Sequence, residues 1–241
     1  ALPIYWWPKM VMLKVLQQYY SATGDERVIE LMSAYFRYQL RELPKTPLGH
    51  WTFWGEQRGG DNLSIVYWLY NITGDEFLLE LGDLIHRQTL DWTGILAGGE
   101  VIPTPFSLHC VNLAQGIKEP VVYYQRSNDP AHVAAVKKGF ADIRRHIGLP
   151  TGLYGGDEAL HGAAPTQGSE LCTAVEMMYS LEEMAEITGD VQFADHLERV
   201  AFNALPTQAT DAYDARQYYQ QVNQVMITDH RRNFEQSHDR S

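Results

Sequence analysis

A short turn recurs four times along the chain and constrains its architecture. Thr-Gly-Asp occupies residues 23–25, 73–75 and 188–190, and Ser-Asn-Asp takes the same place at residues 127–129. Glycine readily adopts the left-handed conformation that ends a helix, and an Asp that follows can cap the next helix with its carboxylate. Each turn therefore predicts a helix hairpin.

The helices on the two sides of each turn differ in pattern. After the turns the apolar residues follow a 3.6-residue period, as at Val28, Leu31, Met32 and Phe36, which predicts helices with one wet face. The segments before the turns would be apolar on almost every face of a helix. This pattern predicts first helices that are buried on several sides, at residues 10–20, 63–70, 111–124 and 173–187.

Hairpins of this kind pack either as an open solenoid or as a closed ring. Helical solenoids repeat every ~34–47 residues, whereas here the period is longer and contains long loops at residues 50–62, 94–107 and 148–168. We therefore expect an all-α chain that forms part of an α/α toroid. The long loops should meet at one rim, opposite the turns.

Composition and charge limit which classes of molecule the chain can bind. The chain has 19 Lys and Arg against 30 Asp and Glu, a formal net charge of −11, which argues against nucleic acid. Its longest apolar runs fall far short of the ~20 residues of a membrane span. We expect a soluble protein, cytoplasmic or, in a bacterium, periplasmic or secreted. Two cysteines leave the compartment open, and the oligomeric state is not indicated.

The loop at residues 50–62 combines aromatic and polar groups that bind sugars. Trp51 and Trp54 offer flat apolar faces, and Asp61 and Asn62 begin the second inner helix. Aromatic faces and carboxylates are typical of sugar sites, so we expect an oligosaccharide or glycoside substrate bound by Trp54, Asp61 and Asn62. The alternative is that the tryptophans pack the loop and that the polar pair caps the helix.

The richest stretch spans residues 154–172 and contains three acids, a histidine and a thiol at or before the start of the fourth inner helix. Ser169 is predicted to be the N-cap, which places Glu170 first and Cys172 third in the helix, where free amides favour a thiolate. A thiolate beside a carboxylate is half of a plausible zinc site. The alternative is a buried free cysteine next to a glutamate that complements the helix dipole.

Two further sets of polar residues lie on the inner helices or at their starts. His109 and Cys110 open the third inner helix in the same topological position, so His109 is expected at the same rim, either as a binding residue or as a structural one. Cys110 is expected in the core. A stripe of glutamates along the fourth inner helix is given no chemical role, at Glu176, Glu182, Glu183 and Glu186.

Several of these segments together resemble the β-L-arabinofuranosidases of glycoside hydrolase family 127. The resemblance is carried by Gly156-Asp157-Glu158, by Glu170-Leu171-Cys172 and by the segments that follow, residues 188–195 and 198–203. It implies an (α/α)6 barrel that hydrolyses β-L-arabinofuranosides or related pectic sugars with retention of configuration. Four hairpins are fewer than the six of such a barrel, so residues 1–241 are expected to form one partial (α/α)6 domain. The resemblance also implies zinc as a cofactor, with a zinc-bound cysteine thiolate as the nucleophile.

The resemblance assigns roles residue by residue. Glu158 matches the acid/base, Glu170 and Cys172 match two zinc ligands, and His109 matches a substrate-binding histidine. Asp61 and Asn62 have no matching family residue of their own type. The nucleophile and the remaining ligand belong to an adjacent cysteine pair that is expected after residue 241.

Two other functions remain open on the sequence. One is a metal-free toroid enzyme, such as a sugar epimerase or an unsaturated-glycoside hydrolase. The other is a non-catalytic helical repeat whose aromatic rim holds a glycan or a protein. Zinc content is the observation that separates them from the thiolate glycosidase.

Overall fold

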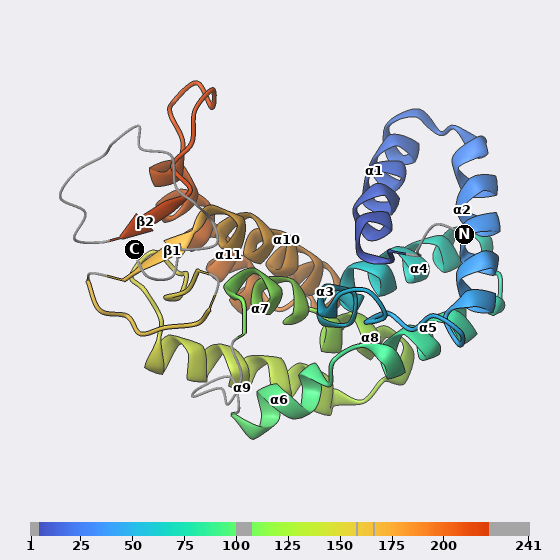
Figure 1. The fold of residues 1–241 in the computed structure, drawn as a ribbon, viewed down its shortest axis with the longest axis horizontal. Coiled ribbons are helices and arrows are strands. Elements are labelled where there is room, and N and C mark those ends of the chain that lie inside the picture. Colours follow the sequence, from blue (N-terminus) through green and yellow to red (C-terminus); the bar gives the residue numbers. More distant parts are fainter. Residues whose placement is uncertain (1–4, 100–107, 158, 166, 222–241) are drawn as a thin grey trace.

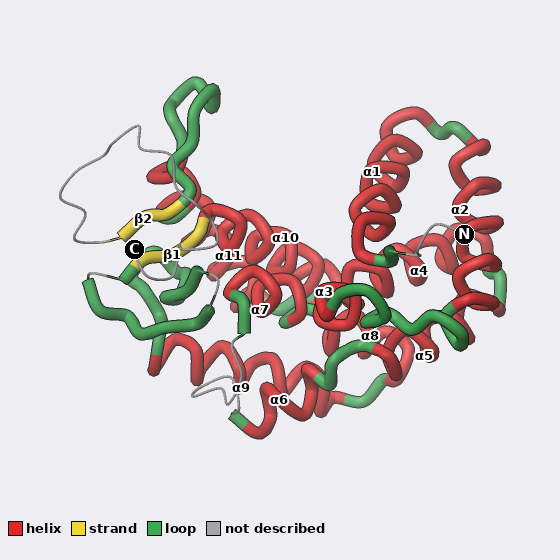
Figure 2. The backbone as a smooth tube through the Cα atoms, viewed as in Figure 1, coloured by secondary structure: helices red, strands yellow, loops and turns green. Residues whose placement is uncertain are grey.

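The computed structural model describes residues 5–99, 108–157, 159–165 and 167–221. These residues are mainly helical, with one two-stranded sheet (Figure 1, Figure 2). The elements in chain order are α1 Trp7–Thr23, α2 Glu26–Glu42, α3 Phe53–Gln57, α4 Gly59–Thr73, α5 Phe77–Gln88, α6 Trp92–Gly98, α7 Cys110–Gly116, α8 Glu119–Ser127, α9 Pro130–His146, β1 Gly168–Glu170, α10 Leu171–Thr188, α11 Val191–Asn203, the 3-10 turn Leu205–Gln208 and β2 Tyr219–Gln221.

The four turns join helix hairpins as predicted: α1–α2, α4–α5, α8–α9 and α10–α11. The residue after each first helix is left-handed, with φ of +66° at Gly24 and at Gly189 and +53° at Asn128. The following Asp caps the next helix in three hairpins. Asp75 is the exception, because α5 starts only at Phe77, and Asp75 instead forms an ion pair with Arg37.

The hairpins form two layers. Helices α4, α7, α8 and α10 pack against one another along the inside, and α5, α9 and α11 pack outside them (Figure 1). Every residue of α7 is buried, in agreement with the predicted inner position. Helix α1 differs from the prediction, because it buries mainly Met10 and Leu13 and leaves Val11 and Met12 more than half exposed.

The third inner helix is broken, although the sequence pattern predicts one helix over residues 111–124. Helix α7 ends at Gly116, and α8 starts at Glu119 with Pro120 in its first turn. Proline has no N–H, and its ring clashes with the carbonyl four residues earlier, which here belongs to Gly116. The chain therefore begins a new helix at this point.

The long loops contain more structure than predicted. The first holds α3, the second begins with α6, and the third ends in β1, which pairs antiparallel with β2 so that Glu170 lies opposite Tyr219. The predicted N-cap is wrong by one residue. Ser169 is held in the strand pairing, so Glu170 is the N-cap and the helix starts at Leu171, which puts Cys172 second rather than third.

Two hydrophobic clusters form the core, one among α1, α2, α4 and α5 and the other among α6 to α11. Buried polar side chains lie between them, among them Arg58, Asn112 and Lys118. Among the helices of the described residues, none combines the length and apolar character that crossing a membrane requires.

Candidate functional site

The carboxylate of Glu170 is the centre of a buried polar cluster. Glu170 ends β1 and caps α10, and its side chain is almost wholly buried. The Cys110 thiol donates to its Oε2 atom at 3.5 Å, and the Tyr218 hydroxyl donates to its Oε1 atom. Its two oxygens are therefore engaged by groups from two other segments of the chain, α7 and the start of β2.

Cys110 is the first residue of α7 and has no exposed surface. The Thr173 hydroxyl donates to its sulfur at 3.0 Å. Burial, and then the charge of Glu170, raise the pKa of the Cys110 thiol well above its ordinary value. Gly156 packs closely against Cys110, because a Cβ atom there would lie 2.7 Å from the Cβ of Cys110.

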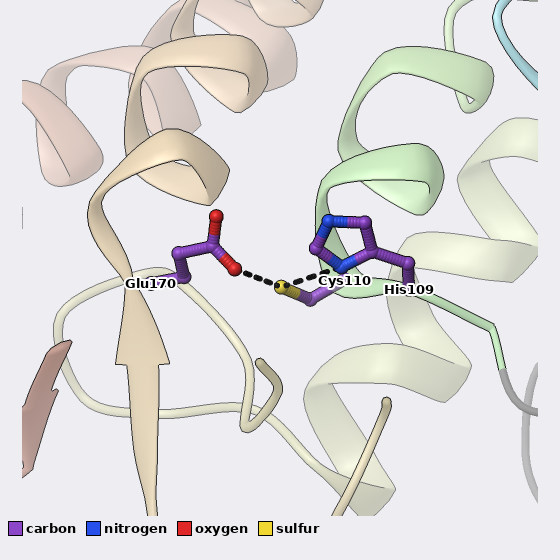
Figure 3. Close-up of side chains that lie close together, drawn as sticks. All are labelled: His109, Cys110 and Glu170. Carbon is purple, nitrogen blue, oxygen red and sulfur yellow. Dashed lines mark hydrogen bonds between the residues drawn. The ribbon is translucent and has the colours of Figure 1, made fainter. Parts of the chain in front are cut away.

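His109 lies beside the thiol as the N-cap of α7. Its Nδ1 atom is 2.8 Å from the carbonyl oxygen of Asp157 and 3.8 Å from the sulfur of Cys110. One donor atom each from His109, Cys110 and Glu170 lie within 4.8 Å of one another (Figure 3). Imidazole, thiolate and carboxylate are zinc ligands, so these described residues can hold a metal ion.

Cys172 also lies near Glu170, whose charge acts on its thiol. Its sulfur is 3.7 Å from the hydroxyl oxygen of Tyr218, and its side chain is half-buried. The expected preference for a thiolate at this helix start is wrong for the metal-free chain, because burial raises the pKa of the Cys172 thiol and the Glu170 charge adds to the rise. A cation would have to supply the compensating charge.

Arg58 connects this cluster to the aromatic loop. It is 6% exposed, its Nε donates to Asn112 Oδ1 at 2.6 Å, and its guanidinium lies 5.0 Å from the Trp7 ring and 4.8 Å from the Trp54 ring. Burial lowers the pKa of Arg58. Four acidic groups oppose that shift and therefore lie near the guanidinium: Asp61, Glu176, Cys172 and Glu170.

Asp61 forms a buried ion pair. The ammonium of Lys118 lies 2.5 Å from one of its oxygens, and Gln115 donates to the other at 2.9 Å. Glu176 belongs to the same group, because burial and the nearby Asp61 carboxylate raise its pKa. Glu176 follows Cys172 by four residues, a spacing that shares one helix face, and this spacing could have identified it from the sequence.

The structure thus gathers five of the predicted residues around Arg58 and Glu170: Trp54, Asp61, His109, Glu170 and Cys172. Asn62 lies elsewhere, since its amide exchanges two hydrogen bonds with Gln39 of α2 and is fully buried. Glu158 lies outside the described residues. Sequence reasoning missed the contacts of Cys110 and the residues Arg58 and Tyr218, which had no motif to identify them.

A cavity of about 410 Å³ lies away from this cluster, between the outer helices α9 and α11. Its walls include Phe140, Arg144, His196 and Arg199. Tyr154 connects the two places, since it lines the cavity and its hydroxyl donates to the carbonyl of Cys110 at 2.7 Å. The ligand-type residues stay together at Glu170, so we take that cluster as the candidate site.

Solved structures share the fold. The chain is similar to the GH127 β-arabinofuranosidase BT3674 (18% identity, TM-score 0.65, covering 87% of this chain and 34% of that one). It is also similar to Ara127N, a GH127 β-L-arabinofuranosidase from Geobacillus stearothermophilus T6 (17% identity, TM-score 0.66, covering 88% of this chain and 38% of that one). An unsaturated glucuronyl hydrolase from Bacillus sp. GL1 has the same fold (11% identity, TM-score 0.60, covering 83% of this chain and 56% of that one).

This chain spans about a third of the length of the two GH127 structures. Among curated protein sequences, none matches it. The family model for the β-L-arabinofuranosidase GH127 catalytic domain matches residues 2–238, and the helix hairpins have the α/α-toroid arrangement of those solved structures. The chain therefore belongs to the GH127 catalytic-domain family of glycoside hydrolases.

Proposed function

We propose that the protein containing this chain is a retaining glycoside hydrolase that acts on β-L-arabinofuranosides or related pectic sugars. The observation that carries the proposal is the family match over residues 2–238, joined to a buried carboxylate, Glu170, that has the thiols of Cys110 and Cys172 near it. Residues 1–241 would form one partial (α/α)6 catalytic domain of that protein.

The donor chemistry fits the zinc ion that the family resemblance implies. Glu170 supplies a carboxylate and Cys172 a thiol, and burial and then the Glu170 charge raise the pKa of that thiol. A divalent cation opposes that shift, because metal binding displaces the thiol proton and balances both negative charges. Zinc bound there would lower the pKa of a nucleophilic thiol and hold it beside the sugar.

The other residues of the chain take roles around that site. In the proposal Glu158 protonates the departing oxygen and then takes a proton from the attacking water. His109, Trp54 and Asp61 bind the sugar, with the Trp54 face against its apolar side. Support for the aromatic wall comes from Arg58, which lies over Trp54 and close to Glu170. The nucleophilic cysteine would follow residue 241.

The test uses the whole protein, purified with and without zinc, and a chromogenic β-L-arabinofuranoside. We expect hydrolysis that a chelator abolishes and that added zinc restores. Glu158→Gln should lower kcat by about 10²–10⁴ fold, the usual worth of a general acid/base. Cys172→Ala should lose zinc and activity together.

Asp157→Asn is the matched control for Glu158→Gln, because the two acids are neighbours in the chain. Full activity in Glu158→Gln with loss in Asp157→Asn would move the acid/base role to Asp157. Zinc-free protein that hydrolyses the substrate, with Cys172→Ala unimpaired, would overturn the thiolate mechanism.

A second candidate function is favoured by the neighbouring carboxyl groups of Asp61 and Glu176, since burial and then the Asp61 charge raise the pKa of Glu176. Two carboxyl groups in different surroundings can act as acid and base without a metal, as a metal-free hydrolase of unsaturated uronides would require. That enzyme would consume an unsaturated uronide in the presence of a chelator. Asp61→Asn would abolish this activity, whereas Cys172→Ala would not.

A further inference from the structure

We propose that the cavity between the outer helices α9 and α11 is a second binding site of this protein, and that its ligand is a carboxylated sugar, a uronate unit of an acidic polysaccharide. The cavity measures about 410 Å³, a size typical of small-molecule sites. The choice of ligand rests on the proposed function, because pectic polymers carry acidic uronate units as well as neutral sugars.

Two guanidinium groups give the cavity a positive character. Arg144 of α9 and Arg199 of α11 both line it, and both lie near His196, since their charges add to the lowering of its pKa that burial causes first. Neither arginine has an ion-pair partner within the described part of the chain. A planar guanidinium matches a carboxylate and can bind it through two hydrogen bonds.

The other charges at the cavity leave this positive character in place. Lys137 also lines the cavity but forms an ion pair with Asp190. Among the described residues that line the cavity, Asp195 is the only acid. The whole chain has a formal net charge of −11, so the cavity is a local exception that attracts an anion which the rest of the chain repels.

An aromatic wall suits the ring that carries the carboxylate. The ring of Phe140 lies 5.1 Å from that of His196 and 6.1 Å from that of Phe193, measured between centroids, and all three residues line the cavity. Sites of this kind combine apolar and aromatic walls with a few convergent polar groups. A free phosphate would use the guanidinium groups but would leave the wall uncovered, so a carboxylated ring fits the site better.

The loop after α9 holds two of these side chains in place. The Nε2 atom of His196 donates to the carbonyl oxygen of Gly152 at 2.7 Å, which fixes the orientation of the imidazole. The stem of Arg199 packs on the same glycine, because a Cβ at Gly152 would lie 3.1 Å from its Cγ atom and 3.2 Å from its Cδ atom. Side chains held in this way lose less conformational freedom when a ligand binds.

Calorimetry of the whole protein with trigalacturonate as the probe tests the site without reference to activity. We expect the fully methyl-esterified probe, which keeps the rings but has no charge, to bind at least about tenfold more weakly. Arg199→Gln should weaken the binding of trigalacturonate by about tenfold or more. Arg145→Gln is the matched control and should leave the Kd unchanged, because Arg145 is exposed and does not line the cavity.

A substitution of opposite sign guards against misfolded variants. Asp195→Asn removes the carboxylate that faces the same ligand, so it should tighten the binding of trigalacturonate by about two- to fivefold, which a damaged fold would not do. Thermal unfolding checks that each variant is folded. Equal binding of the methyl ester, or equal losses in Arg145→Gln and Arg199→Gln, would overturn the inference. Binding of inorganic phosphate but not of trigalacturonate would also overturn it, in favour of a phosphate site.

Hydrolysis of the chromogenic β-L-arabinofuranoside separates this inference from the proposed function. Arg199→Gln should leave that hydrolysis unchanged, because the small substrate has no carboxylate and Arg199 lies outside the Glu170 cluster. A protein that hydrolyses the arabinofuranoside but does not bind trigalacturonate would contradict this inference alone. A protein that binds trigalacturonate through Arg199 but hydrolyses no arabinofuranoside would contradict the proposed function alone.

Discussion

Lys118 lies in the interior of the helical layers with no exposed side-chain surface, and its ammonium is held by three oxygen atoms. These belong to Asp61 at 2.5 Å, to the carbonyl of Gln115 at 3.1 Å and to the hydroxyl of Ser180 at 3.2 Å. A buried ion pair contributes little net stability, but removal of one partner leaves an uncompensated charge. Lys118 thus makes the ionised form of Asp61 tolerable inside the site.

Substitution of Lys118 alone should therefore lower the free energy of unfolding far more than substitution of Lys118 and Asp61 together. Lys118→Met alone is expected to lower the free energy of unfolding by ~3–5 kcal/mol, measured by urea denaturation. The double variant Lys118→Met with Asp61→Asn should recover most of that loss, because no buried charge remains. A double variant as unstable as the sum of the two single ones would contradict this account.

Two half-buried histidines, His196 and His132, give the protein a defined response to acid. Burial lowers the pKa of His196 below its ordinary 6.5, and the positive charges of Arg199 and Arg144 lower it further. The unfolded chain then takes up the proton first as pH falls through about 6.5, so the contribution of His196 to stability is lost below that pH. The pKa of His132 is shifted in the same direction by burial and by His86.

We expect the urea concentration at the midpoint of unfolding to decrease as the pH is lowered from 7.5 to 5.5. His196→Gln keeps a donor for the Gly152 carbonyl, which His196 contacts at 2.7 Å, and should make the fall shallower. A midpoint that does not depend on pH in the unsubstituted protein would contradict the shift, and an identical slope in His196→Gln would assign the effect to other groups.

At the scale of the element, the hairpin turn is the feature that the sequence predicts best. Its signal is local, because a left-handed residue and a capping acid stand next to each other in the chain. The four hairpins and the buried character of α4, α7 and α10 follow from this signal and from the hydrophobic pattern.

Backbone conformation alone explains the glycine at the fourth turn. Gly189 has φ of +66°, and nothing lies within 4 Å of the place where a Cβ would stand. Gly189→Ala should lower the free energy of unfolding by ~1–2 kcal/mol, because a residue with a Cβ is strained in the left-handed conformation. Gly189→Asn should cost less, since Asn128 holds the same conformation in the third turn. Chemical denaturation of the two variants measures the difference, and equal losses would contradict it.

Capping gives a matched pair of substitutions in equivalent turns. Asp129 accepts from the N–H of Ala131 at 2.9 Å and caps α9, whereas Asp75 caps no helix and pairs with Arg37 at the surface. Asp129→Ala should cost ~1 kcal/mol of stability, and Asp75→Ala should cost under ~0.5 kcal/mol on average for an exposed pair. Thermal melts of the two proteins would decide the order, and a larger loss for Asp75→Ala would reverse the assignment.

Non-local contacts mark the limit of prediction from sequence. Glu170 and Cys172 were found because they stand near each other in a dense stretch, and Glu176 could have been found from helical spacing. Tyr218 has no such signal, because the pairing of β1 with β2 brings it to Glu170. The polar role of Cys110 is hidden for the same reason, since its hydrophobic neighbours in α7 predict a core residue.

At the scale of the whole molecule, the interior is divided. Two hydrophobic clusters, one around α4 and α5 and one around α6 to α11, are linked by polar pairs, Arg58 with Asn112 and Asp61 with Lys118. A ligand bound at these pairs would contact elements of both clusters. Binding should therefore stabilise the molecule as a unit rather than one hairpin.

Zinc removal tests this expectation. If zinc is held at Glu170, saturation at 1,000 times its Kd stabilises the folded protein by ~4 kcal/mol, so a chelator should lower the thermal midpoint. Calorimetry of Cys172→Ser should show a smaller effect of the chelator than calorimetry of the unsubstituted protein. A midpoint in the unsubstituted protein that ignores the chelator would exclude a stabilising zinc ion.

The antiparallel pairing of β1 with β2 also dictates when the site can form during synthesis. Each hairpin joins helices that are adjacent in the chain, so it can fold as it leaves the ribosome. The hydroxyl of Tyr218 reaches Glu170 across 48 residues, which a ribosome adds in about 2–10 seconds. During that interval α10 and α11 can assemble before Tyr218 is available to donate to the Glu170 carboxylate. The helix hairpin can therefore form before the site is complete.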